Sequence, residues 1–229
     1  MTPRVVVPGF PHHVRQRGHN RQVVFAHAED YEAYLADMIE LKRAYSVKLY
    51  AYCLMTNHVH LLLAPDTSSG MSLMMKCLAG RHTVRRNRRD GRTGTLWGGR
   101  YGSSVVDTER YLMICCRYIE QNPVRAKIVG DPLAYRWSSC AARLSSNPPA
   151  WLDPDPCYLA MGRTDAERQA TYRAFLNESL SDAQLRLVRD AVRSGQLTGD
   201  PDFGDDIAKR TGRNIERRGP GRPPKRPKK

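Results

Sequence analysis

Two histidines one residue apart, His58 and His60, are the first residues whose type and spacing could do chemistry. The apolar run that follows them, residues 61–63, predicts a strand, and residues i and i+2 of a strand project from the same face. Two neighbouring imidazoles on a rigid strand supply part of the ligand set of a divalent metal. The same spacing also fits two hydrogen-bonded histidines beside an apolar core.

A tyrosine in a helix-like segment is the second candidate. Tyr118 and Asn122 are four residues apart, so they share one face of a helix that Pro123 would end. A phenol can attack a phosphodiester when a metal polarises the phosphorus centre, and an amide oxygen one turn away could complete the metal shell. The alternative is an aromatic side chain packed on the sheet. Other residues of this segment could take either role: Tyr111, Glu120 and Gln121.

The elements that must position these residues follow from the hydrophobic pattern. Alternating β-branched and aromatic residues predict strands, and Thr56-Asn57 predicts the tight turn of a hairpin. Apolar residues at helical spacing predict helices, the last of which carries Tyr118. The expected order is strand 10–17, helix 29–45, strands 47–55 and 58–64, helix 72–89, strand 101–106 and helix 108–122. This succession predicts an α+β fold with an antiparallel sheet.

The character of the sequence changes near residue 145, where proline-rich stretches begin. Helices are expected at 164–177 and 181–194, and Ser181 with Gln184 fits a capping box. The final stretch is rich in proline, glycine and basic residues and predicts a disordered tail. The expected divisions are a domain over 1–145, a linker over 146–163, a helical extension over 164–213 and the tail over 214–229.

The chain is strongly basic. Its 229 residues include 37 basic and 23 acidic ones, a formal net charge of +14 that favours a polyanionic partner. Arginines crowd the end of the predicted helix 72–89, and such like charges repel unless phosphate is near; a solvated helix face is the alternative. Trp97 could stack on unpaired bases or pack in a core. The residues expected to contact DNA are Arg81, Arg85, Arg86, Arg88, Arg89, Trp97, Arg100, Arg218 and Arg222.

Composition excludes several classes of protein. The sequence has no run of about 18 apolar residues and no apolar signal-peptide core, so we expect neither a membrane-spanning nor a secreted protein. The six cysteines lack C-x-x-C pairing, which argues against a zinc knuckle and for reduced thiols in the cytoplasm. His12 and His13 fit strand or DNA-contact residues better than metal ligands.

Several separated segments carry a resemblance to a known family. They are T-N-H-V-H-L-L-L at 56–63, L-W-G-G-R-Y-G-S-S-V-V at 96–106, R-Y-I-E-Q-N-P-V-R-A-K-I-V at 117–129 and Y-R-W-S-S at 135–139. The opening H-H-V-R-Q-R-G-H-N-R-Q adds to them. In this order they resemble the single-tyrosine HUH transposases (IS200-like), and within them the REP-associated tyrosine transposases. The resemblance covers residues 8–145.

This resemblance implies a ferredoxin-like sheet with helices, the HUH endonuclease domain, and cleavage of single-stranded DNA at REP-like hairpins. It makes His58 and His60 the metal-binding pair, Tyr118 the nucleophile and Asn122 the third ligand of Mg²⁺ or Mn²⁺. The tyrosine would form a 5′-phosphotyrosine link and release a 3′-hydroxyl. Family members act as monomers or homodimers. The basic tail around Arg222 resembles an AT-hook, with a nonspecific basic tail as the alternative.

The resulting hypothesis is a metal-dependent transposase that cleaves and rejoins single-stranded DNA at hairpins, in the cytoplasm at the nucleoid. One alternative is a hairpin-binding regulator that has the transposase fold but does not cleave. Another is a metal hydrolase that uses the H-x-H pair; barrel enzymes of that type need a longer chain and later histidines.

Overall fold

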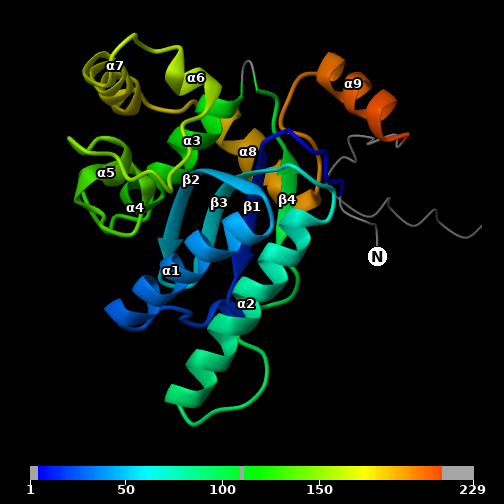
Figure 1. The fold of residues 1–229 in the computed structure, drawn as a ribbon, viewed down its shortest axis with the longest axis vertical. Coiled ribbons are helices and arrows are strands. Elements are labelled where there is room, and N and C mark those ends of the chain that lie inside the picture. The colour runs from blue at the N-terminus through cyan, green and yellow to red at the C-terminus, as the bar shows by residue number, and fades with distance from the viewer. Residues whose placement is uncertain (1–4, 109–110, 213–229) are drawn as a thin grey trace, which may run out of the picture.

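A four-stranded antiparallel sheet forms the centre of the computed structural model, which describes residues 5–108 and 111–212 (Figure 1). Its strands are β1 (His12–Arg17), β2 (Val47–Met55), β3 (His58–Pro65) and β4 (Gly102–Val105), in the order β2-β3-β1-β4. With one helix after β1 and one after β3, this order is the ferredoxin-like topology. The expected α+β fold with an antiparallel sheet is confirmed.

One face of the sheet is apolar and packs on two long helices. These helices, α1 (Ala28–Ala44) and α2 (Gly70–Arg89), contact each other and lie across the sheet (Figure 1). The register pairs Val14 of β1 with Leu61 of β3, and both side chains are fully buried on this face. Alternation along each strand therefore sends the neighbouring residues to the opposite face.

The opposite face carries the candidate site and is covered by α3 (Leu112–Glu120) and α8 (Asp182–Ser194). Leu62 of β3 packs in one buried cluster with Ile119 of α3 and Val188 of α8. Residues that are directly opposite across β1 and β3 share a face, so His60 and its cross-strand partner Arg15 also point here.

The helix that carries Tyr118 ends earlier than predicted. It stops at Glu120, and a short helix α4 (Asn122–Arg125) follows with Pro123 in its first turn. The sequence predicted one helix to Asn122 that proline would end. Proline is tolerated in the first turn of a helix because its missing N–H has no partner there, so Pro123 opens α4 instead.

The remaining helices follow the sheet in sequence. The extension contains α7 (Asp165–Asn177) and α8, and the predicted capping box at Ser181 is present. A third helix, α9 (Pro201–Thr211), was missed by the sequence pattern; its Phe203 packs on Val105. The predicted tail, with Arg218 and Arg222, lies outside the described residues. The shorter elements are η1 (His19–Arg21), η2 (Pro132–Ala134), α5 (Ser139–Arg143) and α6 (Pro156–Leu159).

The segment 146–163, expected to be a linker, packs against the outer strand β2. Asp153 pairs with Lys42 of α1 at 2.5 Å and accepts a hydrogen bond of 2.6 Å from the backbone N–H of Leu49. The backbone N–H of Leu54 donates to the carbonyl of Trp137 at 2.9 Å. Residues that follow the sheet in the sequence therefore cover the outer edge of β2.

The other edge of the sheet is covered in the same manner. Thr198 lies parallel to the end of β4: its N–H donates to the carbonyl of Val105 at 2.8 Å, and its carbonyl accepts from Asp107 at 2.9 Å. Its hydroxyl lies 2.7 Å from that of Ser104. Both outer strands are thus hydrogen-bonded to residues that follow the ferredoxin-like core.

Candidate active site

The His58–His60 pair projects from β3 toward α3, and the two ring centroids are 5.1 Å apart. A third imidazole joins them from β1: the Nε2 atom of His13 lies 2.8 Å from the Nδ1 atom of His60. Sequence reasoning treated His13 as a strand or DNA-contact residue. The signal that could have found it is the antiparallel register of β1 and β3, which makes His13 and His60 diagonal neighbours.

All three imidazoles are held in the neutral form. Burial lowers the pKa of His58 to about 3, with repulsion from Arg17 and Arg15 added to it. Burial also lowers the pKa of His13 to about 3 and holds the pKa of His60 well below its usual range. A neutral imidazole offers the lone pair that a metal ion needs.

Tyr118 lies beside this histidine row in the same chain. Its ring centroid is 5.7 Å from that of His60 and 5.6 Å from that of His13, and both contacts are edge-on. The guanidinium of Arg125 lies over the tyrosine ring, 4.3 Å from its centroid. Tyr111 packs against the core instead, and within the described residues it has no ring contact with a histidine. The geometry therefore favours Tyr118 over Tyr111.

Glu120, which the sequence offered as an alternative metal ligand, is hydrogen-bonded to other side chains. Its carboxylate has no exposed surface and accepts hydrogen bonds from the hydroxyls of Ser139 at 2.6 Å and Tyr172 at 2.7 Å. The Nε atom of Arg143 lies 3.6 Å away. These contacts tie the helix that carries Tyr118 to the C-terminal half of the chain.

The two amides after Glu120 differ in their surroundings. Gln121 donates from Nε2 to the carbonyl of Leu176 in α7 at 2.6 Å, so its side chain is engaged with the extension. Asn122 donates from Nδ2 to the carbonyl of Tyr118 at 3.1 Å. Its amide oxygen has no hydrogen-bond partner among the described residues. Asn122 is therefore the amide better placed to offer an oxygen beside Tyr118.

These residues fit a divalent cation that is held jointly with a bound ligand. Within the described residues, no group of three His, Cys, Asp or Glu side chains is placed to hold a metal ion. The donor set predicted from the sequence is two imidazoles, which burial favours in the neutral form, and the amide oxygen of Asn122; a set of three ligands would leave positions for water or phosphate oxygens. The imidazoles would supply nitrogen ligands, whereas amide, water and phosphate oxygens are the ligands that Mg²⁺ and Mn²⁺ prefer.

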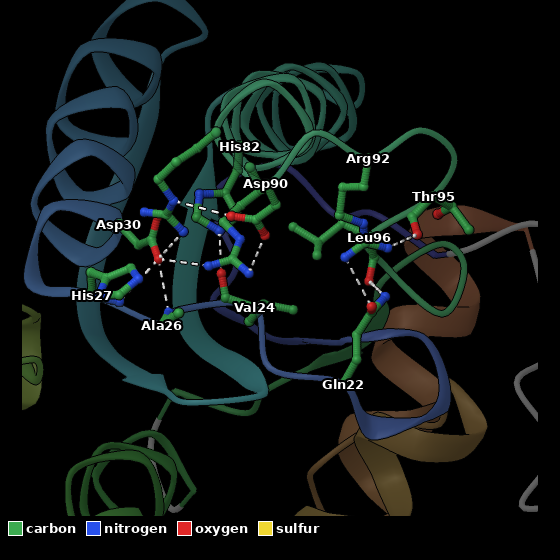
Figure 2. Close-up of polar contacts among 12 residues, drawn as sticks. Gln22, Val24, Ala26, His27, Asp30, His82, Asp90, Arg92, Thr95 and Leu96 are labelled. Carbon is green, nitrogen blue, oxygen red and sulfur yellow. Dashed lines mark hydrogen bonds and ion pairs between the residues drawn. The ribbon is translucent and has the colours of Figure 1, made fainter.

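The arginines at the end of α2 have carboxylate partners that sequence reasoning did not anticipate. Asp30 of α1, only 3% exposed, accepts hydrogen bonds from Arg89 at 2.6 Å and Arg86 at 3.0 Å. Figure 2 shows the Asp30 carboxylate also reaching the backbone N–H groups of Ala26 and His27, at 2.8 and 3.1 Å. This network joins the start of α1 to the end of α2.

Carboxylates of α1 therefore offset the charge of this arginine cluster without phosphate, and contact of these arginines with DNA stays a prediction. Arg81 and Arg85 lie 3.1 and 2.8 Å from carboxylate oxygens of Asp37, so α1 offsets their charge as well. Trp97 is 5% exposed and packs in the core, which is the alternative to base stacking. Arg88 and Arg100 are exposed and have no carboxylate partner among the described residues.

The fold and this site define a class of protein: a ferredoxin-like domain with a histidine pair on a central strand and a tyrosine on a helix against it. Comparison with family models matches residues 9–122 to the IS200-like transposases. The chain belongs to this family.

One solved structure supports the fold. A REP-associated tyrosine transposase bound to a REP hairpin superposes with a TM-score of 0.55 at 15% identity, over 66% of this chain and 88% of that chain. A transposase structure from Deinococcus radiodurans gives a TM-score of 0.37 at 19% identity, over 56% of this chain and 92% of that one. None of the curated proteins matches the chain. Within the described residues, no helix is long and apolar enough to cross a membrane.

Proposed function

We propose that this protein cleaves and rejoins single-stranded DNA at REP-like hairpins through a 5′-phosphotyrosine intermediate. The observation that carries the proposal is the contact of the Tyr118 ring with His60 and His13 of its own chain. A nucleophile of the right type lies beside neutral imidazoles that can bind a metal. Membership of the transposase family and the net positive charge support DNA as the substrate.

In the proposed reaction, the hydroxyl oxygen of Tyr118 attacks the phosphorus of the scissile bond. The bond from phosphorus to the tyrosine oxygen forms as the bond to the 3′ oxygen breaks; the phenol loses its proton, and the 3′ oxygen takes one up. The reverse reaction with a new 3′-hydroxyl rejoins the strand. Arg125, stacked on the Tyr118 ring, restricts the ring and adds positive charge next to it.

His58, His60 and Asn122 would hold the divalent cation, Mg²⁺ or Mn²⁺, which supplies neutralisation of negative charge on the phosphate oxygens. Arg15 lies opposite His60, and Arg17 lies opposite His58, so both guanidiniums face the same region. They contribute fixed positive charge where the phosphate gains negative charge.

The test is formation of a covalent adduct. Purified protein is mixed with labelled single-stranded hairpin DNA from beside its own gene, with Mn²⁺, with Mg²⁺ or with EDTA. We expect an SDS-resistant protein–DNA adduct with metal, absent in Tyr118→Phe and retained in Tyr111→Phe. Hairpin binding without an adduct would identify a regulator. An adduct that survives Tyr118→Phe and is lost in Tyr111→Phe would overturn the assignment of the nucleophile.

A further inference from the structure

Asn57, in the turn between β2 and β3, contacts the first histidine of the candidate site. Its Oδ1 atom lies 2.6 Å from the Nδ1 atom of His58. On the other side, its Nδ2 atom donates a hydrogen bond of 3.3 Å to the backbone carbonyl of Arg21. From the sequence, Asn57 is expected only to form the hairpin turn. In the structure its side chain also lies between a backbone carbonyl and a candidate metal ligand.

These two hydrogen bonds determine which nitrogen of His58 carries the proton. A backbone carbonyl only accepts, so the end of the Asn57 amide that faces Arg21 is the NH₂ group. The amide oxygen therefore faces His58, and since this oxygen also only accepts, the N–H of the imidazole must be on Nδ1. Burial favours the neutral ring, which has a single N–H. The Nε2 atom of His58 therefore keeps its lone pair.

The carbonyl of Arg21 is held in place by an uncommon turn. Asn20 and Arg21 have φ angles of +47° and +61°, in the left-handed region that residues other than glycine seldom adopt. The N–H of Arg21 donates to the carbonyl of Gly18 at 3.0 Å, and that of Gln22 donates to the carbonyl of His19 at 2.9 Å. A Cβ atom at Gly18 would clash with the carbonyl of Gln22, so the close turn requires glycine. Backbone strain of this kind persists only where the surroundings enforce it.

The same segment fixes the backbone of the hairpin turn. The N–H of Gly18 donates to the carbonyl of Asn57 at 2.9 Å. The carbonyl of Thr56 accepts hydrogen bonds from the N–H groups of Val24 and Phe25, at 2.9 and 3.1 Å. Residues 18–25 therefore hold both the backbone from which the Asn57 side chain extends and the carbonyl that orients its amide.

We propose that Asn57 is a positioning residue, which holds His58 in the tautomer whose Nε2 lone pair is free to bind a metal ion. Loss of a hydrogen-bond partner behind a metal-binding histidine costs about 10–100-fold in metal affinity. His60 has its own partner in His13, so each histidine of the pair is oriented by a different element. The inference rests on the proposed function for the use of the metal in cleavage, whereas the tautomer is a property of the metal-free protein.

The experiment records the tautomer directly. Protein labelled with ¹⁵N-histidine is studied by nuclear magnetic resonance without metal, because protonated and unprotonated ring nitrogens have well-separated chemical shifts. The His58→Gln variant identifies the signals of His58. Asn57→Ala removes the acceptor, and Asn57→Asp keeps an acceptor facing the ring. Asn147→Ala is the matched control, since Asn147 is exposed in a loop, and circular dichroism checks that each variant folds.

We expect the proton of His58 on Nδ1 in wild type, in Asn57→Asp and in Asn147→Ala, and a mixture of tautomers in Asn57→Ala. Titration of Mn²⁺ into the same proteins without DNA, followed by electron paramagnetic resonance, should show a loss of about 10-fold or more in Asn57→Ala alone. Three results would each overturn the proposal: a proton on Nε2 of His58 in wild type, unchanged His58 signals in Asn57→Ala, or an altered tautomer with unchanged Mn²⁺ affinity.

The adduct assay separates this proposal from the proposed function. If the tautomer and the Mn²⁺ affinity respond as expected but wild type forms no adduct, Asn57 keeps its role and cleavage is removed. If wild type forms the adduct and the His58 signals of Asn57→Ala are unchanged, cleavage stands and the role of Asn57 is removed.

Discussion

The Nε2 atom of His13 lies 2.8 Å from the Nδ1 atom of His60, between two buried rings whose centroids are 5.0 Å apart. One of these nitrogens carries the shared proton. When His60 carries it on Nδ1, its Nε2 keeps a lone pair for a metal, and His13 fixes the orientation of the ring. Outer hydrogen-bond partners of this kind orient most metal-binding histidines.

We therefore expect His13→Ala to weaken Mn²⁺ binding by about 10-fold or more, because His60 loses the partner that orients it. His13→Gln keeps an acceptor and should recover part of the affinity. The measurement is titration of Mn²⁺ into protein without DNA, followed by electron paramagnetic resonance. His19→Ala, at an exposed position, serves as the control. Equal affinities in wild type and His13→Ala would remove His13 from the metal site.

The buried carboxylate of Asp30 should contribute strongly to stability. Asp30→Ala removes one of the two carboxylates that pair with the buried Arg86, and Asp90 remains as the other, so we expect the free energy of unfolding to fall by about 2 kcal/mol. Asp206→Ala removes the exposed ion pair with Arg210 and should cost about 0.5 kcal/mol. Urea denaturation of both variants measures the two values, and similar losses would contradict the structural role of Asp30.

Asp30 also predicts a direction for the dependence of stability on pH. The hydrogen bond from Arg89 and those from Ala26 and His27 hold the pKa of Asp30 well below its usual range, against the opposing effect of burial. Its contribution is therefore complete above about pH 4, the ordinary carboxyl pKa, and is lost as the pH falls further. Urea midpoints measured from pH 6 downward should fall less steeply in Asp30→Ala than in wild type. Parallel curves would show that another group causes the loss.

Tyr172 should affect the reaction from a distance. Its hydroxyl donates to Glu120, two residues from Tyr118, so Tyr172→Phe leaves a buried carboxylate with one donor fewer. We expect a loss of about 1–2 kcal/mol in unfolding free energy. Because α3 is then less firmly held, adduct formation should slow while the affinity for single-stranded hairpin DNA stays the same. Tyr158→Phe, at the neighbouring ring 5.5 Å away, is the control. Equal adduct rates in the two variants would exclude a positioning role for Tyr172.

The sequence predicted the strands, the main helices and the hairpin well, because alternation and helical spacing are local signals. It did not predict the ion pairs between residues that are far apart in the sequence. The arginines of α2 are paired with Asp30 and Asp37, more than 40 residues earlier, and no local pattern reveals this. Within the candidate site, His58 and His60 could be singled out by their spacing. The contribution of His13 depends on the register of β1 against β3.

The hydrogen bonds of Thr198 to β4, together with those of Asp153 and Trp137 to β2, have a consequence for any attempt to isolate the family domain. A fragment of residues 9–122 would expose unpaired backbone groups along both outer strands, and such edges pair with other chains. The proposed catalytic residues all fall within that fragment, whereas the segments that cover its two edge strands do not. The proposed chemistry and the protection of the sheet edges thus lie in different parts of one chain, and we expect the shortened fragment to aggregate.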